Sequence, residues 1–222
     1  MDRVPERELM IDEAHVRAYA EADFAAPHDS YVQMFQDRFG RSETWGVALD
    51  LGCGPCDVVV RFARVYSTYC VHAVDGSDAM LRYARAKISQ CDDVRQRITL
   101  VCARLSEVVL PRKQYDIVLS NSLLHHLADP HDLWKAIRRY AGQGAPVHIM
   151  DLVRPRSAEA AAELVEAYAG DEPEVLRNDF YQSLLAAYTA EEVVSQLEAA
   201  GLERLSVAMV GDRHMLVSGY AA

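Results

Sequence analysis

The sequence predicts an α/β domain built on a doubly wound, mostly parallel sheet of seven strands. Short apolar runs alternate with helical stretches from residue 47 onward, and a glycine-rich turn follows the first run. Because strands that alternate with helices form right-handed crossover units, the first five runs should lie parallel. The last two runs flank Gly211-Asp-Arg213, which suits a hairpin turn and predicts an antiparallel pair at the end of the sheet.

Each element has its own sequence signal. Residues 1–45 are expected to form an N-terminal helical cover, with helices at 12–24 and 30–39 and a break near Pro27. Residues 46–222 are expected to form the sheet domain, with strands at 47–51, 71–74, 98–102, 115–119, 147–152, 205–210 and 215–220. The helical periodicity within it covers 57–66, 78–90, 131–141, 157–169, 174–185 and 189–201. Residues of about 157–188 are expected to be a helical cover inserted into this domain.

Composition and charge exclude several classes of protein. The chain has 222 residues, half of them hydrophobic, which is enough for one domain with a full core. Its net charge of −10 divides into −5 for residues 1–45, +3 for 46–150 and −8 for 151–200, so no basic stripe suggests nucleic acid. The apolar runs fall short of the roughly 20 residues that span a bilayer. With no export signal, a cytoplasmic protein is expected, and its five cysteines should be free thiols.

The turn after the first strand, Val47-Ala-Leu-Asp-Leu-Gly-Cys-Gly-Pro-Cys-Asp57, lets a ligand lie against bare backbone at a helix N-terminus. A dinucleotide site is disfavoured, because Asp57 stands where the third glycine of GxGxxG belongs. A thioredoxin-like redox centre would use Cys53-Gly-Pro-Cys56. However, the chain is much longer than a thioredoxin fold, and a second acidic motif lies downstream.

The third interpretation rests on the order of two acidic motifs. Asp50-Leu-Gly-Cys-Gly54 is followed, 25 residues after Asp50, by Asp75 at the end of the second strand. This pattern resembles the class I (Rossmann-like) S-adenosylmethionine-dependent methyltransferases, over about residues 47–220. The resemblance implies the sheet order 3-2-1-4-5-7-6 with the last strand antiparallel, and S-adenosyl-L-methionine as cofactor. The cofactor residues that it implies are Asp50, Gly52, Gly54, Asp75, Gly76, Ser77, Met80, Ala103, Arg104, Ser120 and Asn121.

Within the resemblance, the residues have distinct roles. In the family the glycine loop carries the methionine part of the cofactor, and the acid ending strand two holds the ribose, where a carboxylate faces two hydroxyl donors. Ser77 is predicted to cap the next helix and Met80 to pack on the adenine. The third motif departs from the family pattern: Val101-Cys-Ala-Arg-Leu105 has no acid, and backbone groups of Ala103 and Arg104 are expected instead. Tyr115–Pro130 resembles the fourth motif.

Methyl transfer is an in-line displacement. Correct orientation of donor and acceptor alone can lower the activation free energy of such a reaction by on the order of 7–11 kcal/mol. A base is needed only if the acceptor carries a proton at attack. His28, His125 and Tyr181 are the catalytic candidates, each with a purely structural role as the alternative. Side chains of neighbouring helical residues point about 100° apart, so at most one of His125 and His126 should face the cavity. The candidate substrate contacts are Tyr19, Phe24, Tyr31, Asp151, Arg177 and Tyr188.

The sequence therefore predicts a methyltransferase for a small-molecule acceptor, a monomer or homodimer with no nucleic acid, membrane or metal site. Two alternatives remain open. One is an enzyme that uses the cofactor for other chemistry, such as forming a carboxylated sulfonium or decarboxylating a substrate. The other is a noncatalytic subunit that only binds the cofactor.

Overall fold

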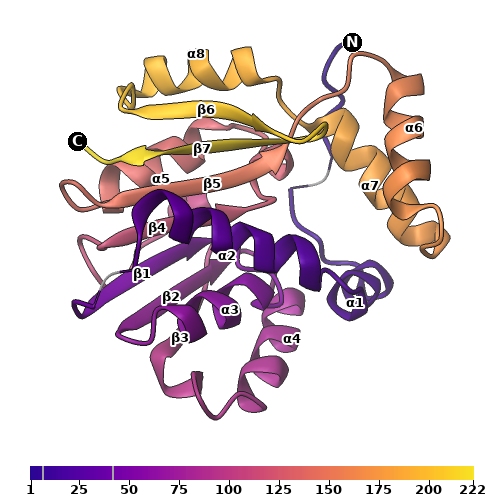
Figure 1. The fold of residues 1–222 in the computed structure, drawn as a ribbon. Helices are drawn as coiled ribbons and strands as arrows, with labels where there is room; N and C mark the ends of the chain where they lie inside the picture. The colour runs from indigo at the N-terminus through magenta and orange to yellow at the C-terminus, as the bar shows by residue number, and fades with distance from the viewer. Residues whose placement is uncertain (7, 42) are drawn as a thin grey trace.

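The computed structural model describes residues 1–6, 8–41 and 43–222 (Figure 1). One seven-stranded sheet, with the order β3-β2-β1-β4-β5-β7-β6, forms its centre and confirms the expected order. β7 pairs antiparallel with β5 and β6, and the other neighbouring strands pair parallel. The strands are β1 (Gly46–Leu51), β2 (Tyr69–Asp75), β3 (Ile98–Cys102), β4 (Ile117–Asn121), β5 (Pro146–Leu152), β6 (Leu205–Val210) and β7 (His214–Tyr220).

Helices cover both faces of the sheet, as the doubly wound prediction requires. α2 (Ala25–Phe39), α3 (Asp57–Val65) and α4 (Asp78–Ser89) pack on one face. α5 (His131–Tyr140) and α8 (Ala190–Ala200) pack on the other. β1 shows why two cores form: Val47, Leu49 and Leu51 join the core under α5 and α8, whereas Ala48 joins the core under α2 and α3.

A third group of helices gathers beyond the carboxyl ends of the parallel strands (Figure 1). α1 (Glu13–Glu21) contacts α4 and α7 (Glu174–Ala186), and α6 (Ala158–Ala169) packs against α7. An extended segment, here called the strap (residues 1–6 and 8–11), runs from the N-terminus past α7 to α1. These elements lie at the sheet edge where open α/β folds bind ligands.

The capping residues that the sequence singled out form the predicted contacts. The Ser77 side chain accepts a hydrogen bond from Met80 N at the start of α4. Thr189 and Glu192 form a reciprocal capping box at the start of α8, which ends at Gly201 in the left-handed region. In the described residues, no helix is both long and apolar enough to cross a bilayer.

Several boundaries differ from the prediction: the first helix ends at Glu21 and not at residue 24, and β2 begins at Tyr69, two residues earlier than expected. Two other differences have a clear physical reason. The helix break near Pro27 is wrong, because α2 begins at Ala25 and Pro27 lies in its first turn, where a missing N–H breaks no helical hydrogen bond. The chain turns at residues 22–24 instead. β4 begins two residues later than expected, because Tyr115 forms only an isolated bridge with Ala141.

Candidate cofactor and active site

A cavity of about 100 Å³ lies at the carboxyl ends of β1, β2 and β4, between the sheet and the strap. The cofactor residues implied by the sequence form most of one side of this cavity. Those on its wall are Asp50, Gly52, Gly54, Asp75, Gly76, Ser77, Met80, Ala103, Arg104 and Asn121. Ser120 lies beneath the wall, fully buried, and its hydroxyl donates to Leu51 O at 2.8 Å.

The glycine loop between β1 and α3 is folded back on the end of β2. The backbone N–H groups of Gly52 and Cys53 both donate to Val74 O, at 2.8 and 2.9 Å. Gly52 has φ +76°, and a Cβ there would lie 2.8 Å from the Leu123 side chain. No larger residue fits at this position without displacing the loop after β4.

Asp75 joins the glycine loop to the start of α4. Its Oδ2 accepts from Gly54 N at 2.9 Å, and its Oδ1 accepts from Ser77 N at 2.7 Å. Burial raises the pKa of this carboxyl, and the two backbone hydrogen bonds oppose the shift. Each carboxylate oxygen has two lone pairs, so each can still accept a ligand hydroxyl.

Two buried acceptor oxygens on the cavity wall have no partner among the described residues. They are Oδ1 of Asp50 and Oδ1 of Asn121. Asp50 is only 2% exposed, and burial together with the charge of Asp75 raises its pKa to about 7. Unpartnered buried acceptors are costly, so their presence at a cavity indicates a ligand that donates hydrogen bonds there. The ammonium group of S-adenosylmethionine fits this requirement.

The strap closes the other side of the cavity, which the sequence did not predict. Glu8, Leu9 and Met10 line the cavity, and Ser77 Oγ donates to Met10 O at 2.6 Å. Arg3 holds the start of the strap, because its guanidinium donates to the carbonyls of Ala186, His125 and Leu127. The strap has no helical or strand periodicity, so no local pattern in the sequence could have indicated its position.

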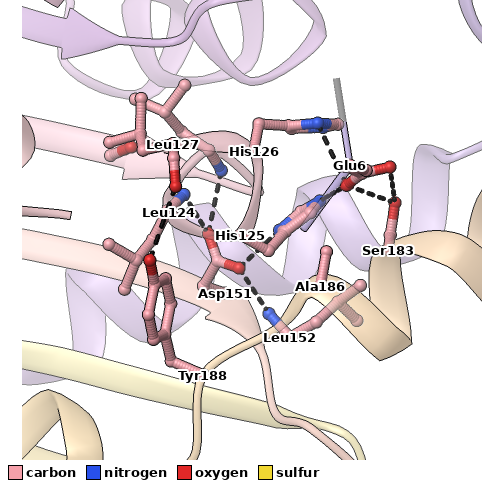
Figure 2. A network of polar contacts seen from close by, with 12 residues as sticks. Glu6, Leu124, His125, His126, Leu127, Asp151, Leu152, Ser183, Ala186 and Tyr188 are labelled. Carbon is pink, nitrogen blue, oxygen red and sulfur yellow. Dashed lines mark hydrogen bonds and ion pairs between the residues drawn. The ribbon is translucent and has the colours of Figure 1, made fainter. Parts of the chain in front are cut away.

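The two adjacent histidines of η3 (Leu124–His126) lie side by side, with ring centroids 4.2 Å apart, and both reach toward Glu6 (Figure 2). His126 lines the cavity. His125 is 3% exposed, and its Nδ1 lies 2.6 Å from Asp151 Oδ1. Only one of the pair therefore faces the cavity, as expected, but it is His126 and not the chosen candidate His125.

Asp151 holds η3 in place and is away from the cavity wall. Its Oδ2 accepts from Leu123 N at 2.8 Å and from Leu124 N at 2.7 Å (Figure 2). Burial lowers the pKa of His125, but Asp151 and Glu6 outweigh it, so the pKa of His125 is raised. The structure thus gives Asp151 a positioning contact where the sequence predicted a substrate contact.

The cover helices bring three predicted residues together. Tyr19 and His28 line the cavity, and the Phe24 ring lies beside both, with centroid distances of 5.1 and 5.7 Å. Burial raises the pKa of Tyr19 to about 12 and lowers the pKa of His28 to about 4. At pH 7 the phenol is therefore a hydrogen-bond donor and the imidazole is neutral.

Four further predicted site residues lie away from this cavity. Tyr31 is in the core, where its hydroxyl donates to His148 O at 2.7 Å, because the helix turns this face toward the sheet. Tyr188 is buried beneath the Arg3 guanidinium, 4.1 Å from the ring centroid. Arg177 and Tyr181 line a separate open hollow formed by α6 and α7. The amphipathic packing of these helices against each other accounts for that placement.

The glycine-loop cysteines do not have the environment of a redox centre. Cys53 and Cys56 are buried free thiols, and the more accessible Cys70, Cys91 and Cys102 are free thiols as well. Burial, with the neighbouring Cys56, raises the pKa of Cys53 well above its ordinary value. Reactive redox thiols have lowered pKa values, so this arrangement disfavours the thioredoxin-like interpretation.

The family model of the methyltransferase domain matches residues 48–146, from β1 to the start of β5. This part of the chain is a methyltransferase domain. It contains the glycine loop, Asp75 and η3, and it agrees with the methyltransferase family that the resemblance implied.

Similar proteins agree with the methyltransferase fold. A methyltransferase from Aquifex aeolicus superposes with a TM-score of 0.70 and 18% identity, covering 96% of this chain and all of that one. A phosphoethanolamine N-methyltransferase 2 from Haemonchus contortus, solved with S-adenosylhomocysteine, superposes with a TM-score of 0.65 and 19% identity. The match covers 88% of this chain and 43% of that one. The protein arginine N-methyltransferase 1 of Schizosaccharomyces pombe is 26% identical over 113 residues, 51% of this chain. The chain spans 28% of that protein's length.

Proposed function

We propose that this methyltransferase domain acts on a small-molecule acceptor. The observation that supports cofactor binding is the pair of buried acceptor oxygens without partners on Asp50 and Asn121. Both lie on the cavity wall with the glycine loop and Asp75. Asp50 and Asn121 would hold the cofactor ammonium, and Asp75 its ribose hydroxyls. When bound, the cofactor supplies an electrophilic methyl group on a sulfonium.

The remaining side of the cavity supports the choice of acceptor. The strap and residues of α1 and α2 line this side of the partly open cavity, which leaves room for a small group beside the cofactor. Tyr19 would donate a hydrogen bond to the acceptor, and the neutral His28 would accept one from its hydroxyl or amine. Both contacts orient the attacking atom, the main requirement of this reaction. Residues 1–45 would thus serve as the cover of the cavity, and the α6–α7 pair, which contacts α1 but lines none of the cavity with its described residues, would support that cover.

Calorimetric titration with S-adenosylhomocysteine tests the cofactor side. Wild type should bind, and Asp75→Ala should bind at least about 100-fold more weakly, since it loses two charged hydrogen bonds of about 1.5 kcal/mol or more each. Asp92→Ala, a change at an exposed aspartate paired with Arg95, is the matched control and should bind like wild type. No binding by wild type would overturn the proposal.

Mass spectrometry with cofactor carrying an isotopically labelled methyl group tests the acceptor side. Labelled small-molecule products are expected from panels of amines, phenols, thiols and carboxylic acids. Label found only on an arginine-containing peptide would contradict the small-molecule acceptor. Cofactor consumed with no labelled methyl product would instead favour the non-methylating alternative, and cofactor bound without any turnover would favour a noncatalytic subunit.

A further inference from the structure

Three possible metal ligands meet where the strap crosses η3 (Figure 2). Glu6 Oε1 lies 3.1 Å from His126 Nδ1 and 3.7 Å from His125 Nε2. All three ligand atoms lie within 4.8 Å of one another. An ion with bonds of about 2.0–2.2 Å holds tetrahedral ligands roughly 3.4 Å apart, so the two measured distances fit a shared ion.

The donor set and its surroundings have the chemistry of a transition-metal site. Two imidazoles and one carboxylate are ligands that zinc takes in catalytic sites with an open fourth position. Metal-bound histidines usually donate their other ring N–H to a carboxylate, which fixes the tautomer. His125 has this arrangement. Its Nδ1 lies within hydrogen-bond distance of the Asp151 carboxylate, and its Nε2 is directed at Glu6.

Two further contacts point to a ligand in this position. His126 Nδ1 is buried, and Glu6 Oε1 lies 3.1 Å from it, at ion-pair distance. With the imidazole proton on Nε2, the Nδ1 lone pair would be available to an ion shared with that carboxylate. Ser183 Oγ donates to Glu6 at 3.2 Å and orients the carboxylate from the α7 side (Figure 2).

We propose that Glu6, His125 and His126 bind a divalent transition-metal ion, with Zn²⁺ as the fitting species. The ion would join the strap to η3 and so hold the cover over the cofactor cavity. It would also lie at the wall of that cavity, which His126 lines. The site does not depend on the reaction of the domain, and zinc binding is measured without cofactor or acceptor.

Calorimetric titration of the chelator-treated 222-residue chain with zinc tests the site. Wild type should bind one equivalent. Glu6→Gln and His126→Gln should each weaken binding at least about 100-fold, because loss of even an outer-shell partner costs about 10–100-fold. Ser183→Ala, which removes such a partner, should cost about 10-fold. His131→Gln, at the start of α5 and outside the cluster, should leave zinc affinity unchanged.

The thiols of Cys53 and Cys56 are the main competing metal ligands. Co²⁺ spectra and a cysteine variant distinguish binding at these thiols from binding at the Glu6, His125 and His126 cluster. Co²⁺ should give visible bands without a thiolate charge-transfer band, and Cys53→Ser/Cys56→Ser should keep its zinc affinity. Circular dichroism and melting temperature without metal establish that each variant folds. Wild-type affinity in Glu6→Gln or His126→Gln, binding lost only in the cysteine variant, or no saturable binding by wild type would overturn the proposal. In the last case the cluster is an ion-pair network.

Discussion

At the residue scale, Asp50 combines two properties that a surface carboxylate does not have. It is buried with an unpartnered oxygen, and its pKa is raised to about 7. A carboxyl whose folded pKa is raised contributes stability that is present below its ordinary pKa and is lost as pH rises through about 7. Near neutral pH the free protein therefore holds a large fraction of Asp50 in the protonated form. A cation beside this group would favour the carboxylate.

Binding of S-adenosylhomocysteine near pH 7 should accordingly release roughly half a proton from Asp50. Calorimetry in buffers of different ionisation enthalpy measures this number directly. Asp50→Asn should bind more weakly, and the dependence of its binding enthalpy on the buffer should be smaller. Proton uptake by wild type, or equal release by the variant, would contradict the assignment of the ammonium to Asp50.

At the scale of elements, local signals in the sequence explain what could be predicted. The capping box of Thr189 and Glu192 and the glycine loop were recognisable because their residues interact with close neighbours in the chain. The strap has no such signal, since Arg3 contacts carbonyls 122 to 183 residues away. Glu6 consequently was not paired with the two histidines, and no metal site was predicted. Tyr31 was misplaced because its ring belongs to the buried face of α2.

Thr189→Ala should lower the free energy of unfolding by about 1 kcal/mol, because it removes the side chain that accepts from Glu192 N at the start of α8. Urea denaturation measures the change. Ser195→Ala, on the exposed side of the same helix, should stay within about 0.5 kcal/mol of wild type. Equal losses in the two variants would indicate that the capping box does not stabilise α8.

At the scale of the whole molecule, the sheet order could be predicted and one feature of its core could not. His148 of β5 is fully buried beside the rings of Tyr31, Phe35 and Phe39. Neither ring nitrogen has a hydrogen-bond partner among the described residues, and burial lowers the pKa of His148 to about 4. The sequence shows this histidine within an apolar run, but its aromatic neighbours come from a helix more than 100 residues earlier.

The unfolded chain binds a proton at His148 between about pH 6.5 and 4, and the folded chain does not, so acid should destabilise the protein in this range. Between pH 6.5 and pH 4, the free energy of unfolding of His148→Phe should therefore fall by about 2–3 kcal/mol less than that of wild type. Urea denaturation at a series of pH values measures the difference. His28 and His214 shift in the same direction, so some acid sensitivity should remain. His131→Phe, outside the core, should behave as wild type does, and an unchanged pH dependence in His148→Phe would exclude this role.

The strap also bears on how the protein is made. Its residues are synthesised before the rest of the domain, and the groups that Arg3 and Val4 bind, from His125 to Ala186, follow more than 120 residues later. The strap can dock only after α7 has been made and has folded onto the sheet. During synthesis the first half of the domain therefore presents an open glycine loop, and closure of the cofactor site is one of the last steps of maturation.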